Sequence, residues 1–350
     1  MSGRTLAVRL DNDGDVLLTG PAVRALAAGS ASVTLWCGPR GAAAAELLPG
    51  LDELIVHRAP WIDPEPEPVD RAWLMSLVNE VAARRFDRAL VFTSFHQSSL
   101  PAALLLKMAG IPFVGGISED YPGSLLDLRH RVPDDLHEVE RSLSLVAAAG
   151  FDLPAGDDGA LRIKEDLGQA AGVPFDGPYL VVHPGASVPA RAWSPELNRE
   201  LVTELAARGD RVVVTGGPSE AALTEFVAGA GSPSVADLGG RLTLGGLAQV
   251  LRNADAVVVG NTGPAHLAAA VGTPVVSLFA PTVPAVRWHP WRVPHVLLGE
   301  QLIQCAGCRA RVCPVEGHPC LSTVRPAEVL AAVDALRQGR DAAVLAEAAR

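Results

Sequence analysis

Short apolar segments alternate with segments of helical character along the first half of the chain. Each apolar segment ends in polar residues, glycine or proline, and most of them lead into a helical pattern. Strands that alternate with helices predict a parallel sheet with helices on both faces. The expected strands are 5–10, 32–36, 54–56, 88–92 and 113–115, and the expected helices are 21–28, 41–48, 100–109 and 134–149.

The second half alternates more regularly, which predicts a second sheet of the same kind. Its expected strands are 179–182, 211–215, 235–238, 256–259 and 274–278, with helices 195–208, 219–230, 244–253 and 264–271 between them. A stretch without a clear strand, 151–178, separates the two series. We therefore expect an α/β fold of two doubly wound domains, residues 1–160 and 161–325, and a final helix within 326–350.

Composition narrows the class of protein. With 49% hydrophobic and 19% charged residues among 350, the chain can bury two sizeable cores. The net charge of −10, from 39 acidic and 29 basic residues, argues against nucleic acid as a partner. No apolar run approaches the roughly 18 residues that a membrane-spanning helix needs, and no signal-peptide pattern opens the sequence. We expect a cytoplasmic protein with at most peripheral membrane contact.

Common nucleotide and hydrolase motifs are missing from the sequence. It contains no Gly-x-Gly-x-x-Gly, no Gly-x4-Gly-Lys-Ser/Thr and no Gly-x-Ser-x-Gly. Asp11, Asp13 and Asp15 resemble the start of a calcium-binding loop, but Val16 and Ala22 stand where that loop requires Gly and Glu. Dinucleotide enzymes, P-loop ATPases, α/β-hydrolases and EF-hands are therefore disfavoured.

Two loops at expected strand ends carry candidate phosphate-binding groups. In residues 260–266, the Thr262 hydroxyl, the amide of Gly263 and a helix N-terminus would suit a diphosphate. Thr262 could equally serve as a helix N-cap in an ordinary turn. In residues 183–193, Ser187 offers a hydroxyl and Arg191 a guanidinium, which binds phosphate well. Arg191 could instead be a surface residue.

Four loops together resemble glycosyltransferase family 9, the ADP-heptose:lipopolysaccharide heptosyltransferases. They are Gly14-Asp15, His183-Pro-Gly-Ala-Ser followed by Arg191-x-Trp-x-Pro, Thr215-Gly-Gly-Pro-x-Glu, and Gly260-Asn-Thr-Gly-Pro-x-His. The resemblance implies a GT-B fold, with two Rossmann-like domains facing across a cleft. It also implies an acceptor site on the N-terminal domain, a donor site on the C-terminal domain and a last helix that packs back on the N-terminal domain. The implied reaction is inverting transfer of a heptose from ADP-heptose to the lipopolysaccharide inner core.

The resemblance assigns roles to individual residues. Asp15 matches the proposed general base, which would take the proton of the acceptor hydroxyl; Asp11 and Asp13 compete for that role, and any of the three could merely cap a helix. Tentative acceptor contacts are Asp11, Asp13, His96 and Arg129. The implied donor contacts are Ser187, Arg191, Glu220, Asn261, Thr262, Gly263 and His266.

Two of the implied donor contacts, Asn261 and Glu220, leave the donor or the role of the residue open. Asn261 stands where related heptosyltransferases carry Asp, which leaves the donor less defined. Glu220 could hold the ribose hydroxyls or simply favour a helix start. Since a guanidinium and backbone amides can meet the charge of the leaving group, no cofactor is required for catalysis.

A cysteine-rich segment lies near the C-terminus. Cys305, Cys308, Cys313 and Cys320 fall within sixteen residues, with His318 in the last gap. In a reducing compartment this spacing favours metal over disulfides, and a structural zinc fits better than an iron–sulfur cluster.

Alternatives to a heptosyltransferase stay open. A GT-B transferase or an epimerase could use another nucleotide-sugar, and a non-catalytic protein could bind one. Asp15 distinguishes a transferase from a non-catalytic binding protein, since a binding protein needs no carboxylate beside the anomeric carbon. The partners expected are an ADP-sugar donor and a glycan or glycolipid acceptor.

Overall fold

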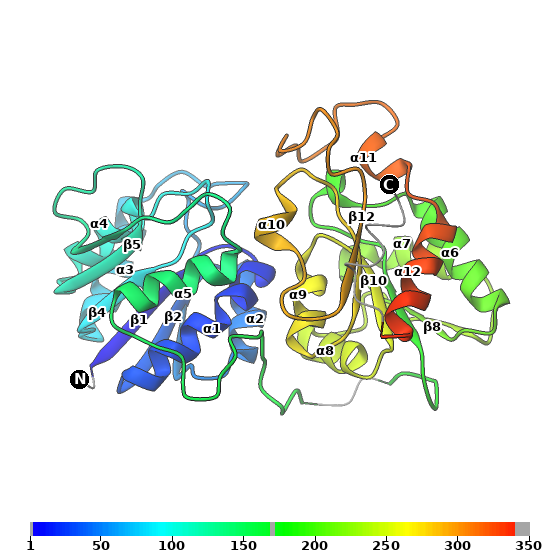
Figure 1. Ribbon diagram of the computed structural model, residues 1–350. Helices are drawn as coiled ribbons and strands as arrows, with labels where there is room; N and C mark the ends of the chain where they lie inside the picture. Colours follow the sequence, from blue (N-terminus) through cyan, green and yellow to red (C-terminus); the bar gives the residue numbers. More distant parts are fainter. Residues whose placement is uncertain (1–2, 169–171, 340–350) are drawn as a thin grey trace. The chain divides into compact units, whose positions relative to one another are not determined.

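Each half of the chain forms its own six-stranded parallel sheet (Figure 1). The computed structural model describes residues 3–168 and 172–339. It divides into two units, Met1–Lys164 and Glu165–Arg350, close to the boundary expected after residue 160. The two sheets confirm the expected α/β fold.

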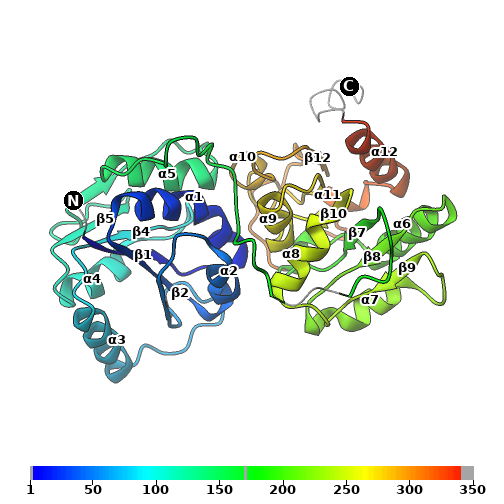
Figure 2. The same ribbon diagram turned by 90° about the horizontal axis from the view of Figure 1, so that it is seen from below.

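The first sheet has helices on both faces (Figure 2). Helices α1, α2 and α5 lie on one face, where α1 packs beside α5, and α3 and α4 lie together on the other. The strands are β1 (Arg4–Arg9), β2 (Ser32–Cys37), β3 (Glu53–Val56), β4 (Arg88–Val91), β5 (Phe113–Ile117) and β6 (Leu128–His130). The helices are α1 (Asp13–Gly29), α2 (Ala42–Leu47), α3 (Arg71–Ala83), α4 (Leu100–Met108) and α5 (Glu138–Ala148), with a 3-10 turn, η1 (Pro39–Gly41).

The second unit repeats this plan. Its strands are β7 (Leu180–His183), β8 (Val212–Val214), β9 (Val235–Asp237), β10 (Ala256–Gly260), β11 (Val275–Leu278) and β12 (His295–Leu298). Its helices are α6 (Pro195–Ala207), α7 (Ala221–Ala228), α8 (Leu244–Arg252), α9 (Gly263–Ala270), α10 (Ala285–Trp288), α11 (Pro319–Ser322) and α12 (Pro326–Arg337). Two 3-10 turns, η2 (Pro189–Arg191) and η3 (Pro218–Glu220), precede α6 and α7.

The two sheets share one strand order. The first runs β3-β2-β1-β4-β5-β6, and the second runs β9-β8-β7-β10-β11-β12 when read from the β9 edge. In each sheet the strand order switches direction between two central neighbours. These are β1 and β4 in the first sheet, and β7 and β10 in the second. Open α/β sheets bind ligands beyond the carboxyl ends of strands at this switch point. The fold therefore directs attention to the residues that follow β1, β4, β7 and β10.

Helix α1 begins earlier than the sequence predicted. Pro21 was expected to open a helix, but α1 starts at Asp13 and contains Pro21 in its interior. Pro21 has no N–H to donate to the carbonyl of Leu17, which costs the helix one hydrogen bond. Because residues 16–18 and 22–26 are buried, packing maintains the helix across the proline. Asp15, expected in a loop, consequently lies in the first turn of α1.

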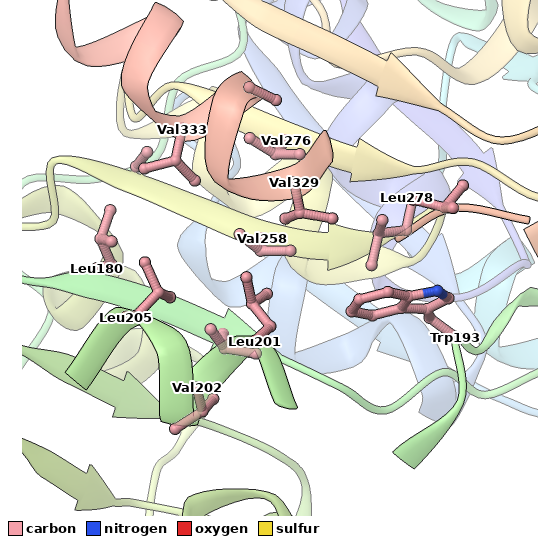
Figure 3. Close-up of a cluster of buried hydrophobic side chains, with 14 of the residues drawn as sticks. Leu180, Trp193, Leu201, Val202, Leu205, Val258, Val276, Leu278, Val329 and Val333 are labelled. Atoms are coloured by element: carbon pink, nitrogen blue, oxygen red, sulfur yellow. The ribbon is translucent and has the colours of Figure 1, made fainter. Parts of the chain in front are cut away.

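Apolar side chains from β7, β10 and β11 form the core of the second unit together with α6 and α12 (Figure 3). Val329 and Val333 of α12 are buried against these strands, and Trp193 is 2% exposed beside Leu278. The described helix ends at Arg337, and residues 340–350 of the expected longer helix lie outside the described residues. Packing of the last helix on the N-terminal domain stays a prediction.

No helix among residues 3–168 and 172–339 is long and apolar enough to cross a membrane.

Candidate functional site

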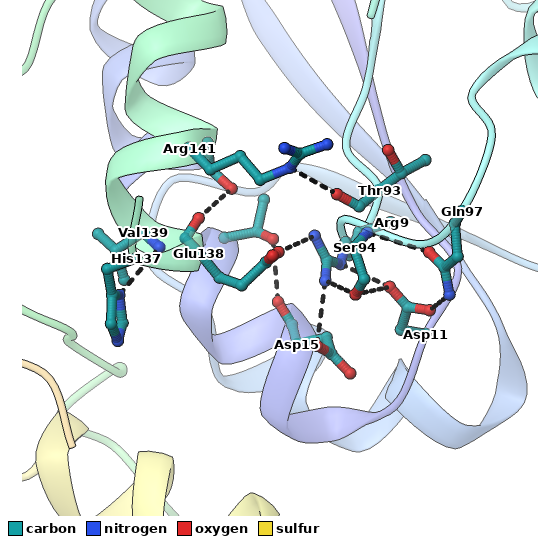
Figure 4. A network of polar contacts seen from close by, with 12 residues as sticks. Arg9, Asp11, Asp15, Thr93, Ser94, Gln97, His137, Glu138, Val139 and Arg141 are labelled. Atoms are coloured by element: carbon teal, nitrogen blue, oxygen red, sulfur yellow. Dashed lines mark hydrogen bonds and ion pairs between the residues drawn. The ribbon is translucent and has the colours of Figure 1, made fainter. Parts of the chain in front are cut away.

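A buried arginine organises the polar residues at the switch point of the first sheet (Figure 4). Arg9 is the last residue of β1 and is 1% exposed. Its Nη2 lies 3.0 Å from Oδ1 of Asp15, and its Nε lies 2.9 Å from Oδ2 of Asp11. The structure thus places two of the three candidate acids, Asp11 and Asp15, around one cation.

The segment after β4 closes this cluster from the neighbouring strand. Ser94 Oγ accepts a hydrogen bond from Arg9 Nη2 at 2.9 Å, and Gln97 Nε2 donates to Asp11 Oδ1. Asp11 is buried, and burial raises its pKa against the opposing effect of the Arg9 charge. Its carboxylate is therefore occupied within the first unit, which argues against the expected contact with an acceptor.

Asp13 and Asp15 accept hydrogen bonds from different donors. Oδ1 of Asp13 accepts a hydrogen bond from the amide of Ala44 at 3.0 Å, and burial raises the pKa of Asp13. Asp15 is 20% exposed and accepts from Arg9 through Oδ1. Within residues 3–168, no donor bonds to Oδ2 of Asp15. Asp13 and Asp15 are thus each held through Oδ1, with no donor bonded to Oδ2 within residues 3–168, and of these two only Asp15 is held by the arginine at the switch point.

The other tentative acceptor residues are His96, which stands between Ser94 and Gln97 in the segment after β4, and Arg129 of β6. His96 is exposed, with its ring 5.2 Å from that of Phe95. Arg129 donates from Nε to the carbonyl of Ser118 at 3.0 Å and from Nη2 to that of Glu119. These bonds commit the guanidinium of Arg129 to shaping the loop after β5, and its role toward an acceptor stays a prediction.

In the second unit, the loop after β10 leads into the N-terminus of α9. Thr262 precedes the helix with extended backbone, and its side chain makes no capping hydrogen bond. Thr262 is therefore the N-cap residue of α9, as the alternative expected, but its hydroxyl does not make the capping bond. Asn261 is buried, donates from Nδ2 to the carbonyl of Ala280 at 3.2 Å, and has no hydrogen-bond partner for Oδ1 among the described residues. His266 is buried one turn into α9.

The turn that carries Arg191 packs directly on the end of β10. A Cβ atom on Gly260 would lie 2.8 Å from the carbonyl oxygen of Arg191, so only glycine permits this approach. Arg191 itself is half-buried, and its Nε donates to Oγ1 of Thr282 at 3.2 Å. The structure therefore brings Arg191 and the 260–262 loop together, while Ser187 lies exposed between β7 and η2.

Glu220 follows β8 and faces the end of β7. Its Oε2 accepts from the amide of Gly217 at 2.7 Å and lies 3.9 Å from Nε2 of His183. His183 bonds through Nδ1 to Oγ1 of Thr215 at 3.0 Å, and burial lowers its pKa despite the nearby Glu220 charge. A Cβ on Gly185 would overlap Glu220 at 2.0 Å. Glu220 thus caps its own turn and also abuts the 183–187 loop.

The four cysteines of the C-terminal segment line one small cavity of about 30 Å³ together with His318. Burial and the neighbouring thiols raise the pKa of Cys320 to about 11, and His318 Nε2 pairs with the carbonyl of Ala190 at 3.0 Å. Among the described residues, no group of three His, Cys, Asp or Glu side chains is arranged to hold a metal ion. The zinc stays a prediction, and no step of a reaction is derived from it.

Sequence reasoning missed several residues of these clusters. Arg9 and Glu138 of the first unit and Thr282 of the second were not singled out. The available signal for Arg9 was a charged side chain at the end of an apolar strand, directly before an acidic loop. Glu138 and Thr282 carried no such signal, because tertiary packing alone brings them to the site.

The chain resembles known glycosyltransferases in sequence. A family model described as glycosyltransferase family 9 (heptosyltransferase) matches residues 74–318. Lipopolysaccharide heptosyltransferase 3 of Escherichia coli is 32% identical over 45% of this chain and 46% of its own length. Lipopolysaccharide heptosyltransferase 1 of Pseudomonas aeruginosa is 33% identical over 62% of this chain and 61% of its own. The matched chain spans about half to two thirds of the length of these curated relatives.

Solved structures match over nearly the whole chain. A glycosyl transferase of family 9 from Veillonella parvula has a TM-score of 0.75 at 18% identity and covers 96% of this chain and 97% of its own. The ADP-heptose lipopolysaccharide heptosyltransferase II of E. coli has a TM-score of 0.73 at 20% identity, with coverage of 96% and 99%. This likeness confirms the expected GT-B fold. With the family model matching well over half of its residues, the chain belongs to glycosyltransferase family 9.

Proposed function

We propose that the protein is an inverting glycosyltransferase that moves a heptose, or a related sugar, from an ADP-sugar to a glycan acceptor such as the lipopolysaccharide inner core. Membership of family 9 and the lipopolysaccharide heptosyltransferases among its relatives support this class of reaction. The observation that carries the proposal is the geometry of Asp15 at the switch point of the first sheet: Arg9 fixes Oδ1, and no donor among the described residues of this unit bonds to Oδ2.

Asp15 would act as the general base. Inversion in a single displacement requires a group that takes the proton of the acceptor hydroxyl as that oxygen attacks the anomeric carbon. Oδ2 of Asp15 is available for this proton, whereas Arg9 and Gln97 engage both oxygens of Asp11. Asp13 is bonded through Oδ1 to the amide of Ala44, and within residues 3–168 it has no contact with Arg9 that would orient it. A positioned base of this kind contributes roughly 10²–10⁴-fold to the rate.

The donor diphosphate would bind where Arg191 meets the loop after β10. The Arg191 guanidinium supplies positive charge, and the Thr262 hydroxyl and the Gly263 amide at the start of α9 supply hydrogen-bond donors. These groups would stabilise the negative charge of the departing ADP without a cofactor. Ser187 lies on the same loop as Arg191 and would add a further hydroxyl.

Two more residues would select the donor. Glu220 is 23% exposed and would accept hydrogen bonds from the ribose hydroxyls. The unbonded Oδ1 of Asn261 would accept from a donor group of the bound nucleotide-sugar. An asparagine there carries no charge to repel phosphate, so the position is compatible with an ADP-sugar.

The proposal is tested by binding and by transfer. Thermal shift is measured with ADP-heptose and with UDP-, GDP- and TDP-sugars, and transfer is measured with heptose-free lipopolysaccharide as acceptor. ADP-heptose at a hundredfold excess over its Kd should stabilise the protein by about 2.7 kcal/mol. Stabilisation by another nucleotide-sugar alone would refute the ADP-sugar assignment but leave the fold's transferase class intact. Tight donor binding without transfer to this or other glycans would favour a binding protein.

A further inference from the structure

Arg9 is enclosed by three carboxylates that come from three parts of the first unit (Figure 4). Beside Asp11 and Asp15, Oε2 of Glu138 from α5 lies 3.5 Å from Nη1 of Arg9. Glu138 is 0% exposed, and neither of its carboxylate oxygens has a hydrogen-bond partner among the described residues. All three guanidinium nitrogens of Arg9 therefore face an acid.

Three carboxyl groups surround the single positive charge of Arg9, so their protonation states depend on one another. Burial raises the pKa of Glu138 to about 7, even though Arg9 opposes the shift. For Arg9, burial by itself would lower the pKa, but the charges of Asp11, Asp15 and Glu138 outweigh it and raise the pKa above its ordinary value. Arg141 also faces Glu138 from the same helix and donates from Nε to the carbonyl of Thr93 at 3.3 Å. Arg9 thus keeps its charge while its buried acidic neighbours tend to hold protons.

The planar fork of arginine suits this arrangement. Nη2 donates at once to Oδ1 of Asp15 at 3.0 Å and to Oγ of Ser94 at 2.9 Å, while Nε points at Asp11. Since Ser94 is buried and fixed to the segment after β4, Arg9 is held from a second strand and cannot swing with Asp15. A lysine carries the same charge at one atom, so it cannot hold these directions together.

We propose that Arg9 is a positioning residue for Asp15: it fixes Oδ1 by a hydrogen bond and so turns Oδ2 toward the acceptor hydroxyl. This inference rests on the proposed function, in which Asp15 is the base. Arg9 touches no substrate in this scheme and acts only through Asp15. When Oδ2 takes the proton of the acceptor, Asp15 becomes a neutral acid, and its Oδ1 can still accept the hydrogen bond from Arg9.

The test uses the full-length chain with ADP-heptose and heptose-free lipopolysaccharide. In Arg9→Met, we expect kcat to fall about 10²-fold, because Oδ1 of Asp15 loses the hydrogen bond that orients the base. The Kd for ADP-heptose should stay within a factor of about two, since no donor contact is changed. Arg9→Lys keeps the charge but not the directed hydrogen bonds of the guanidinium, so kcat should still fall.

Arg24→Met is the matched control. Arg24 is a buried arginine of α1, and its Nε lies 2.6 Å from Oδ2 of Asp157. Its hydrogen bonds go to Asp157 and to the carbonyl of Ala160 rather than to Asp15. Its loss should lower the melting temperature and leave kcat near that of the wild type. An Arg9→Met protein that melts lower but keeps the wild-type kcat would show that Arg9 is merely structural and would overturn the inference.

Two further variants keep the outcomes distinct. If Arg9→Met does not fold, Arg9→Lys decides, because wild-type kcat in that variant excludes a need for the guanidinium that joins Asp15 to Ser94. Asp15→Asn is assayed in parallel. Loss of activity in Asp15→Asn with normal activity in both Arg9 variants would overturn the positioning role and leave the base in place. Normal activity in Asp15→Asn would overturn the proposed base itself.

Discussion

The guanidinium of Arg191 donates from Nε to the side-chain oxygen of Thr282, 3.2 Å away. Thr282 is buried and follows β11, so the arginine of the η2 turn is anchored to the neighbouring strand end. The amide of Arg309 in the cysteine segment donates to the carbonyl of the same threonine. The orientation of the proposed phosphate-binding cation therefore depends on a residue that makes no phosphate contact itself.

Replacing Arg191 should weaken donor binding. In Arg191→Ala, the diphosphate loses a charge-assisted partner, and we expect the Kd for ADP to rise by one to two orders of magnitude, in line with roughly 1.5–3 kcal/mol for such a bond. Isothermal titration with ADP measures the change. Thr282→Val keeps the arginine but removes its anchor, so a smaller loss is expected. An unchanged Kd in Arg191→Ala would place this residue outside the donor site.

Asp15→Asn should separate catalysis from folding. Asparagine retains an acceptor for the Arg9 hydrogen bond, yet it cannot take a proton at neutral pH. We expect kcat to fall by roughly 10²–10⁴-fold while donor Kd and melting temperature change little. Steady-state transfer assays give the first value and thermal denaturation the last. Asp13→Asn is the control and should be milder, since Asp13 is bonded to the amide of Ala44.

Glu138 should make the stability of the protein fall with rising pH. Burial raises the pKa of Glu138 from 4.5 to about 7, so the unfolded chain releases its proton before the folded one does. The stability that protonation preserves is complete below pH 4.5, falls as pH rises toward 7, and is lost above it. The total is about 3 kcal/mol.

Glu138→Gln removes this titration. Relative to the wild type, the variant should gain stability between pH 5 and pH 8, as measured by urea unfolding at both values. Glu65→Gln, on an exposed loop, should behave equally at both. A Glu138→Gln protein whose difference from the wild type is the same at pH 5 and pH 8 would contradict a buried, protonated Glu138.

The four C-terminal thiols provide a prediction about metal content. Protein purified without chelator should contain about one equivalent of zinc, and changing Cys305, Cys308, Cys313 and Cys320 to serine should abolish it. Elemental analysis and thiol titration measure this directly. Metal-free protein with four reactive thiols in this segment would disprove a zinc site. Two hydrogen bonds would then anchor the segment to the η2 turn: His318 Nε2 pairs with the carbonyl of Ala190, and the amide of Ala190 donates to the carbonyl of Arg311.

Periodicity predicted the sheets well because most buried strands are continuous apolar runs. Val181, Val213 and Val258 belong to such runs, and each run ends in a glycine or a polar loop. Strand β6 was not predicted, because Leu128–His130 has three residues and no apolar run. Strand β12 and helix α3 were also missed. Short edge strands depend on the partner strand more than on their own composition.

The site was predicted where backbone chemistry leaves a mark in the sequence. Glycine at 260 and the Thr262-Gly263 pair identify the loop after β10, since a side chain at 260 would collide with the Arg191 turn. The buried cluster around Arg9 could not be predicted, because it assembles from β1, the segment after β4 and α5, which are distant in sequence. Pro21 misled the prediction of α1, because proline usually marks the first turn of a helix.

The shared strand order has an evolutionary consequence. Each sheet has its own switch point, so under the proposed function each substrate is recognised by loops that hang from a separate scaffold. Substitutions in the loops after β4 and β5 can then alter acceptor choice while the backbone that cradles the nucleotide stays as it is. A family built in this way can change its acceptor specificity under selection while its donor specificity stays the same. Exchanging whole units between relatives then becomes a practical route to new sugar linkages.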